Sequence, residues 1–322
     1  MAGALSTLSL LRRTSMRRFV GIDVAKAELV IHVLPDGLAW TQPNTAQGRS
    51  ELVQRLARLE CERIVLEASG GYEHEVLRTL RQADLPAVRM CAQRPRALAK
   101  ALGIKAKTDA LDARLLAVAA QAIAATPTDV LPEHLQHLRE LLDLRNALVG
   151  QHDALRRRLE HITSPEVRRH CQEAIDLLKR QSDALKRDLQ QRADACSTLP
   201  KVPGLGPILR ATLAARLPEL GTLPPRKLAA LVRLAPFNHD SGRWQGQRRI
   251  KGGRSDVRRA LYMATWASIR AKSPLAQTYA RLQAAGKPAK VAIVACMHKY
   301  LRWLNAIARD QGPYTPPAIA AA

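Results

Sequence analysis

Four acidic residues stand where a carboxylate could do chemistry. Asp23 and Glu67 each close a short apolar run, where an ionised carboxylate is costly unless it is paired or bound to a metal ion. Asp109 and Asp112 are three residues apart, so both lie in the first turn, on one face, of a helix that begins near Thr108. Magnesium prefers carboxylate oxygens, and phosphoryl transfer can use two such ions about 4 Å apart.

Each acid also has an ordinary structural explanation. A single acid at a strand end is usually a turn former or a salt-bridge partner, and acids at a helix start complement the helix dipole. Taken together, in this order and on separate elements, the four acids favour a magnesium site, with two ions expected per active site.

The elements that must position these acids follow from the apolar pattern between Arg18 and Ala125. The pattern predicts strands at 19–24, 28–34, 38–41, 63–68 and 87–91, and helices at 46–59, at 72–83 and from about Arg94. Three leading strands followed by β-α-β alternation predict an α/β domain over residues 17–130, with a mixed sheet covered by helices. Residues 1–16 are expected to be a disordered basic lead-in, and Met16 could be the true start.

The middle of the chain, residues 131–197, has a different pattern. Apolar residues recur every seven positions at Leu141, Leu148, Leu155 and Ile162, and a similar spacing resumes from Ile175 to Cys196. Ser164 and Pro165 between them are typical of a helix start. Two long helices are expected, forming a helical hairpin or a coiled-coil pairing surface. Such short heptad runs serve packing within one chain as often as dimer formation.

The last region, residues 198–310, is mostly helical and strongly basic. Helices are expected at 207–217, 225–234, 256–272 and 288–309, with a Gly- and Arg-rich loop at 240–254 and a loose tail at 311–322. The formal net charge of the chain is +23, and from Lys201 onward 21 Lys and Arg face 4 Asp and Glu. This charge indicates a nucleic-acid partner, although composition alone also allows a ribosome-like or membrane-surface basic protein.

The five cysteines are scattered, without a Cys-x-x-Cys pair. This pattern predicts reduced core thiols in the cytoplasm, with neither a zinc site nor a disulfide framework.

Three separated motifs carry a family resemblance. Gly21-Ile22-Asp23-Val24-Ala25-Lys26, Leu66-Glu67-Ala68-Ser69-Gly70-Gly71-Tyr72 and Lys107-Thr108-Asp109-Ala110-Leu111-Asp112-Ala113-Arg114 resemble, in this order, the DEDD transposase family. That family groups the Piv and MooV DNA invertases with bridge-RNA-guided insertion-sequence recombinases. The resemblance implies a RuvC-like domain of the ribonuclease H-like fold, with Asp23, Glu67, Asp109 and Asp112 as ligands of Mg²⁺.

The C-terminal motifs extend this resemblance. Val202–Gly206 resembles the hairpin of helix-hairpin-helix modules, in which glycine amides such as those of Gly204 and Gly206 contact DNA phosphates. Ser241, before Gly242, corresponds to the family's serine nucleophile, although from its spacing alone it would be a loop hydroxyl or a helix cap. A hydroxyl needs a base or a metal for activation, which the carboxylates would supply. Further phosphate contacts are expected at Lys26, Lys107, Arg243, Arg248, Arg249, Lys251, Arg254, Arg258, Arg259, Lys287 and Lys290.

The favoured function is a transposase or site-specific recombinase that cuts and rejoins donor and target double-stranded DNA. The resemblance further implies a noncoding guide RNA and a homo-oligomer, a dimer of dimers, in the cytoplasm at the nucleoid. Four alternatives stay open: a DNA invertase of the same family, a junction-resolving nuclease that uses only the carboxylates, an actin-like ATPase or sugar kinase, and a non-catalytic nucleic-acid binder. The kinase fold has glycines after its first aspartate, whereas Val24 and Ala25 follow Asp23 here.

Overall fold

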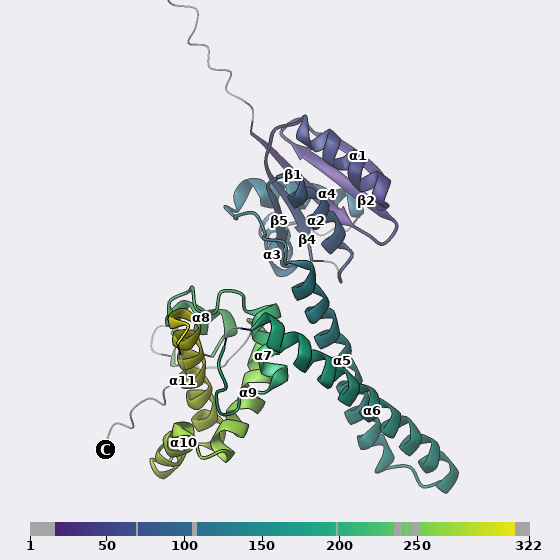
Figure 1. Ribbon diagram of the computed structural model, residues 1–322. Helices are drawn as coiled ribbons and strands as arrows, with labels where there is room; N and C mark the ends of the chain where they lie inside the picture. Colours follow the sequence, from purple (N-terminus) through teal and green to yellow (C-terminus); the bar gives the residue numbers. More distant parts are fainter. Residues whose placement is uncertain are drawn as a thin grey trace, which may run out of the picture. The chain divides into compact units, whose positions relative to one another are not determined.

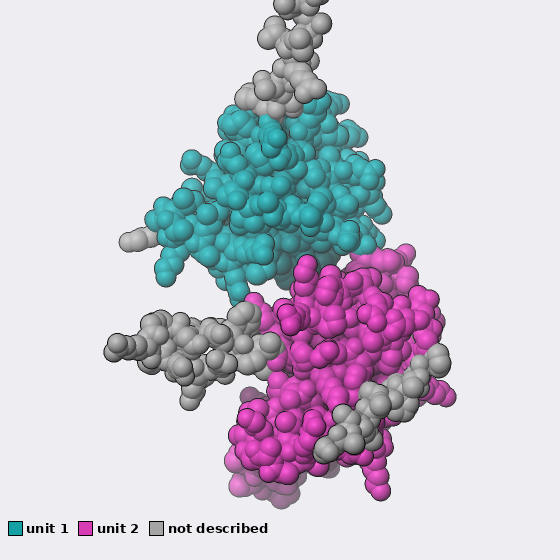
Figure 2. Space-filling model, turned by 90° about the vertical axis from the view of Figure 1, so that its left-hand side faces the viewer, with its two compact units in different colours: residues 1–130 teal, residues 131–322 magenta. Residues whose placement is uncertain are grey.

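The computed structural model describes residues 17–68, 70–104, 108–197, 199–234 and 252–312, and the backbone of 240–241 and 244–245 (Figure 1). The chain divides into two compact units, residues 1–130 and 131–322 (Figure 2). None of the described helices has the length and apolar character needed to cross a bilayer.

Unit 1 is built on a five-stranded mixed sheet with the strand order β3-β2-β1-β4-β5. The strands β1 (Arg18–Val24), β2 (Glu28–Leu34) and β3 (Leu38–Pro43) form an antiparallel meander. The strands β4 (Cys61–Glu67) and β5 (Ala87–Met90) run parallel to β1. The mixed sheet expected from the alternating pattern is therefore confirmed, with each strand within about two residues of its predicted bounds.

Helices cover both faces of this sheet. On one face, inward side chains of the strands pack with α1 (Ala46–Ala57) and α2 (Glu73–Gln82) in a fully apolar core. On the other face, Phe19 and Val65 pack against α4 (Asp109–Ala122) and α3 (Gln93–Ala101). This arrangement fits a ribonuclease H-like domain.

One glycine sets how closely α4 approaches the sheet. A Cβ atom on Gly21 would lie 2.0 Å from the carbonyl oxygen of Ala113 and 2.3 Å from the amide nitrogen of Ala117. Side chains alternate along a strand, so Gly21 faces α4 together with Asp23, two residues later. Because no larger residue fits at this point, the backbone of α4 rests directly on β1.

Unit 2 is mostly helical in its described residues. The helices α5 (Glu133–Leu159) and α6 (Pro165–Cys196) pack side by side as a hairpin (Figure 1). Ser164 caps α6 and Pro165 occupies its first turn, as predicted. The heptad residues Leu141, Leu148 and Leu155 are only half-buried. A coiled-coil pairing between chains therefore stays a prediction.

The remaining helices form a second core. They are α7 (Pro207–Arg216), α8 (Pro225–Val232), α9 (Ser255–Arg270), α10 (Pro274–Ala284) and α11 (Ala289–Asp310). Their shared core includes the fully buried Tyr300, whose hydroxyl donates to the Pro203 carbonyl at 2.8 Å. A second cluster joins α7 to the hairpin through small and branched apolar residues.

Two expectations need correction. The helix α10 was not expected, although Ser273 caps it and Pro274 occupies its first turn, the same pair of residue types that starts α6. The cysteines are not all core thiols: Cys296 is buried, whereas Cys91 is exposed because it lies just beyond the last buried residue of β5.

The close packing at Gly21 generates a prediction about stability. Gly21→Ala should lower the free energy of unfolding by about 1–3 kcal/mol or more, because the added methyl group meets the backbone of α4 instead of a movable side chain. Urea unfolding followed by circular dichroism measures this change.

Gly150 provides the matched control, because it lies within α5 and an added Cβ meets no atom within 4 Å. Gly150→Ala should stabilise the chain by about 0.5–1 kcal/mol. If the two substitutions changed the free energy of unfolding equally, the contact of Gly21 with α4 would not contribute to stability.

Candidate active site

Two of the four predicted acids lie at the ends of neighbouring parallel strands. Ile22 of β1 is in register with Leu66 of β4, so the next residues along the strands, Asp23 and Glu67, lie side by side at the carboxyl end of the sheet. Both belong to the strand face that α4 covers, because the preceding residues pack in the core on the opposite face. The sheet therefore brings together two acids that are 44 positions apart in sequence.

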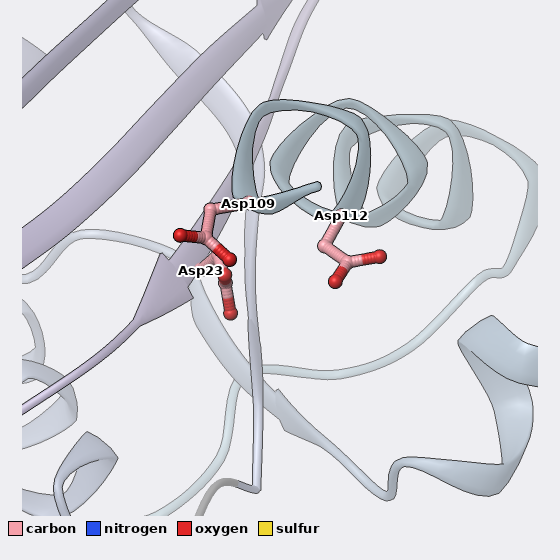
Figure 3. A group of neighbouring side chains, drawn as sticks. All are labelled: Asp23, Asp109 and Asp112. Atoms are coloured by element: carbon pink, nitrogen blue, oxygen red, sulfur yellow. The ribbon is translucent and has the colours of Figure 1, made fainter. Parts of the chain in front are cut away.

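The start of α4 brings the other two acids to the same place. Thr108 caps this helix by accepting a hydrogen bond from the Leu111 amide at 3.3 Å, which puts Asp109 and Asp112 in the first turn. Figure 3 shows both side chains on the side of α4 that carries them toward Asp23. One carboxylate oxygen from each of Asp23, Asp109 and Asp112 lies within 4.8 Å of the other two.

The crowding of these acids perturbs Asp23. Burial, together with the negative charges of Asp112, Asp109 and Glu67, raises the pKa of Asp23 to about 6. Glu67 is thus near enough to act on Asp23 electrostatically, although it is not among the three acids that converge within 4.8 Å. The cluster gathers negative charge that a cation would neutralise.

Glu67 has additional neighbours that sequence reasoning missed. Its carboxylate lies 3.9 Å from the guanidinium of Arg96 in α3. The turn that follows Glu67 is held by the buried Glu73, whose carboxylate accepts a hydrogen bond from the Gly71 amide at 2.8 Å and lies 3.5 Å from Arg89. The sequence does place Glu73 six residues after Glu67, but an acid in the first turn of a helix is so common that it did not stand out.

The donor set fits a hard divalent cation. Two oxygens bound to one Mg²⁺ lie about 3 Å apart when adjacent and about 4 Å apart when opposite, given metal–oxygen distances of about 2.1 Å. The oxygens of the three converging carboxylates lie within 4.8 Å of one another, which is close to that spacing. Carboxylate oxygens without histidine or cysteine favour magnesium, manganese or calcium over zinc.

Ser241 lies in a segment that the structure describes only in part. The short strands β6 (Asp240–Ser241) and β7 (Trp244–Gln245) pair antiparallel, with Ser241 opposite Trp244. Only the backbone of Ser241 is described, so the position of its hydroxyl is not part of the described structure. Four of the predicted phosphate contacts, Arg243, Arg248, Arg249 and Lys251, lie outside the described residues.

Two arginines expected to contact DNA hold the ends of this segment together. The guanidinium of Arg258 donates to the carbonyls of Val232, before the segment, and Gly252, after it, both at 2.9 Å. The Arg254 amide donates to the Leu231 carbonyl at 3.1 Å. These bonds fix the distance between the two ends of the Ser241 segment.

The Arg254 side chain is also used within the unit. Its guanidinium forms an ion pair with Glu219 at 2.5 Å and donates to the Arg216 carbonyl at 3.0 Å. Burial alone would raise the pKa of Glu219, but the hydrogen bonds and charge of Arg254 outweigh it and lower that pKa. Arg254 and Arg258 thus have structural partners that the basic sequence pattern did not reveal.

The other predicted contacts differ in exposure. Lys26, Arg259, Lys287 and Lys290 are exposed, and Lys107 lies outside the described residues. Gly204 faces inward: its φ is +86°, and a Cβ would lie 2.4 Å from the Ala264 carbonyl oxygen. Gly206 is exposed, and its amide donates to the Gly204 carbonyl at 2.9 Å.

Two protein-family models match this chain. One, described as a transposase, matches residues 20–164, and the other, described as the transposase IS116/IS110/IS902 family, matches residues 196–281. The first match includes all four acids, and the second includes Ser241. The chain belongs to the IS116/IS110/IS902 transposase family.

Curated relatives extend this match over nearly the whole chain. The pilin gene-inverting proteins of Moraxella bovis and Moraxella lacunata are each 26% identical to it, over 92% of this chain and 98% of the relative. The resemblance drawn from the three acidic motifs is therefore confirmed. The chain is a DNA-modifying recombinase, and its substrate is DNA.

Burial and the neighbouring negative charges at Asp23 predict that the metal-free protein loses folding stability in a pH-dependent way. The pKa of this carboxyl is about 6 in the folded chain against an ordinary value of 3.8, so ionising it opposes folding. This loss is absent below about pH 4, grows as the pH rises toward 6 and stays constant above that. Asp23→Asn should therefore be more stable than the parent at pH 7.5, on the order of 1 kcal/mol after solvent screening.

Urea unfolding in EDTA at several pH values tests this prediction. The stability difference between Asp23→Asn and the parent should vanish near pH 4. Asp129→Asn is the control, because Asp129 is exposed and outside the cluster. A pH-independent difference for Asp23→Asn would contradict the electrostatic cause.

Proposed function

We propose that this protein cuts and rejoins DNA strands, with Asp23, Glu67, Asp109 and Asp112 holding Mg²⁺ and with Ser241 as the nucleophile. The observation that supports it most is the convergence of three carboxylates from β1 and α4, with Glu67 alongside on β4. Three features hold the acids in place: the packing of Gly21 against α4, the Thr108 cap of α4 and the register of β1 with β4. An incidental group of surface acids would not have such support.

The carboxylates have a defined task in this proposal. They bind and orient the reacting phosphodiester through the cation, which, when bound, neutralises charge on the phosphate and lowers the pKa of an attacking hydroxyl. Asp23 and Glu67 come from the rigid sheet, whereas Asp109 and Asp112 come from a helix start pinned to that sheet. Such rigid placement suits phosphoryl transfer, because its catalysis depends on positioning and on electrostatic stabilisation.

Ser241 supplies the covalent step. Its Oγ forms a bond to phosphorus while the bond from phosphorus to one deoxyribose oxygen breaks, and the serine proton passes to a basic group as the leaving oxygen gains one. The product is a phosphoserine link to one DNA end and a free hydroxyl on the other. Attack by a hydroxyl of a different strand reverses the step, so strands are exchanged without an external energy source.

Two partners belong to the proposal through the family resemblance. One is a structured noncoding RNA that pairs with donor and target DNA, for which the net charge of +23 provides electrostatic support. The other is the chain itself as a dimer of dimers, because recombination cuts several strands in register. The names of the curated relatives favour a second outcome of the same chemistry, inversion of a DNA segment.

The carboxylates are tested by strand cleavage. A plasmid carrying this gene with its native flanking DNA should be cut or rearranged by the parent protein in Mg²⁺ and left intact in EDTA. Asp109→Asn should lower the rate at least about a hundredfold, since losing even a group that only supports a metal ligand costs about 10–100-fold. Asp129→Asn, outside the cluster, should keep the parent rate. Full activity of Asp109→Asn would exclude the proposed site.

Ser241 is tested by trapping the covalent intermediate. Denaturation during the reaction should leave a DNA fragment attached to the parent protein, and mass spectrometry should locate it at Ser241. Ser241→Ala should give no adduct and no rejoined product while binding DNA as tightly as the parent. Cutting by Ser241→Ala at the parent rate, with no adduct ever trapped, would favour the junction-resolving nuclease. Sequencing the products separates inverted segments from insertions at new sites.

A further inference from the structure

The last three helices carry far more basic than acidic residues, and their two acids, Asp256 and Asp310, stand near the first and last ends of this stretch. From Val257 to Arg309 the sequence holds ten Lys and Arg and no Asp or Glu. Arg309 forms an ion pair with the neighbouring Asp310, and the stretch itself supplies no acid that could pair with the other cations. It therefore complements a polyanion much better than an apolar or mixed-charge protein partner.

Aromatic rings gather on the outward face of α9 within this basic region. Arg259, Tyr262, Trp266 and Arg270 follow one another at steps of three or four residues, so they share one helical face. The opposite face, which includes Val257, Leu261, Ala264 and Ser268, is buried in the core. The set Arg259, Tyr262, Trp266 and Arg270 is called the α9 aromatic face below.

The rings on this face hold one another in place. Tyr262 meets Trp266 edge to face, with the centroids 6.4 Å apart, and Trp266 meets Tyr279 of α10 in the same way at 5.2 Å. Tyr262 nevertheless leaves 39% of its surface open to solvent, and neither it nor Trp266 belongs to the apolar core cluster. Tyr279 packs against that cluster, but core packing does not explain the exposed ring of Tyr262, in a chain with only 3% aromatic residues.

The chemistry of this face matches unpaired nucleobases. An exposed ring that its neighbours already immobilise can stack on a base at little cost in conformational entropy. The exposed guanidinium groups of Arg259 and Arg270 lie before and after the rings along α9, where they suit the phosphates between successive bases. A duplex cannot use the rings in this way, because its bases already stack on each other.

We propose that the α9 aromatic face is a binding surface for single-stranded nucleic acid, with Tyr262 stacking on an unpaired base and Arg259 contacting an adjacent phosphate. This surface goes beyond the proposed strand cleavage, because it involves neither the carboxylates nor Ser241. Binding here therefore does not require a bound metal ion.

Fluorescence anisotropy in EDTA with the full-length chain tests the surface. The probes are a 20-nucleotide single-stranded DNA, an RNA of the same sequence and the corresponding DNA duplex. Tyr262→Ala should weaken single-strand binding about tenfold and change duplex binding less than about twofold. Tyr262→Phe keeps the ring and should bind as the parent does. Where Tyr262→Ala lowers the melting temperature, Tyr262→Leu keeps the apolar bulk and should show the same selective loss.

Salt dependence separates stacking from charge. Tyr262→Ala should leave the slope of log K against log salt unchanged, whereas Arg259→Gln should reduce that slope by about 0.7 on single strands. If Tyr262→Ala weakens binding to both the single-stranded DNA and the RNA, the surface binds either nucleic acid. If it weakens binding to only one of them, that one is the ligand. Parent-like single-strand binding by Tyr262→Ala, or equal losses on single strands and duplex, would overturn the proposal. Neither result depends on cleavage activity, so the strand-cleavage proposal succeeds or fails separately.

Discussion

The direct packing of α4 on the backbone of Gly21 is the contact on which the candidate site depends. Because Gly21 has no side chain, the carbonyl of Ala113 and the amide of Ala117 lie where any Cβ would stand. This contact sets the height of α4 above β1, and Asp109 and Asp112 begin that same helix. Asp23 is two residues beyond Gly21 on the same strand face, so one close approach determines the distance between acids from two elements.

The site also carries an electrostatic cost that the rest of unit 1 offsets. Three carboxylates converge within 4.8 Å, and burial together with their charges raises the pKa of Asp23 to about 6. Local stability alone would disfavour this arrangement, as is common at sites whose geometry serves chemistry. The apolar sheet core beneath it is almost fully buried and holds the strand ends in place.

In unit 2, several arginines bind carbonyl or carboxylate groups of the protein itself, whereas others are exposed to solvent. Arg258 joins the two ends of the segment that carries Ser241 through its guanidinium, and Arg254 does so through its backbone amide. Arg210 is buried against the chain before α7, where its guanidinium donates to the Pro200 carbonyl. Arginine suits this task because its planar guanidinium donates to several carbonyl oxygens at once. The charge count of the region therefore overstates how many cations are free to bind a partner, and Arg259 and Arg270 of α9 are among the exposed ones.

Local patterns in the sequence determined the elements of this protein. Alternating apolar residues predicted β2 with its observed bounds, Thr108 predicted the start of α4, and Ser164 with Pro165 predicted the start of α6. These signals are local because they act through the backbone bonds and side-chain directions of neighbouring residues. Only the tertiary structure decided that three of the four acids converge while Glu67 stands beside Arg96, that Glu73 braces the turn after Glu67, and that Arg254 binds Glu219. Such contacts join residues distant in sequence, and their geometry depends on how whole elements pack, as the approach of α4 to Gly21 illustrates.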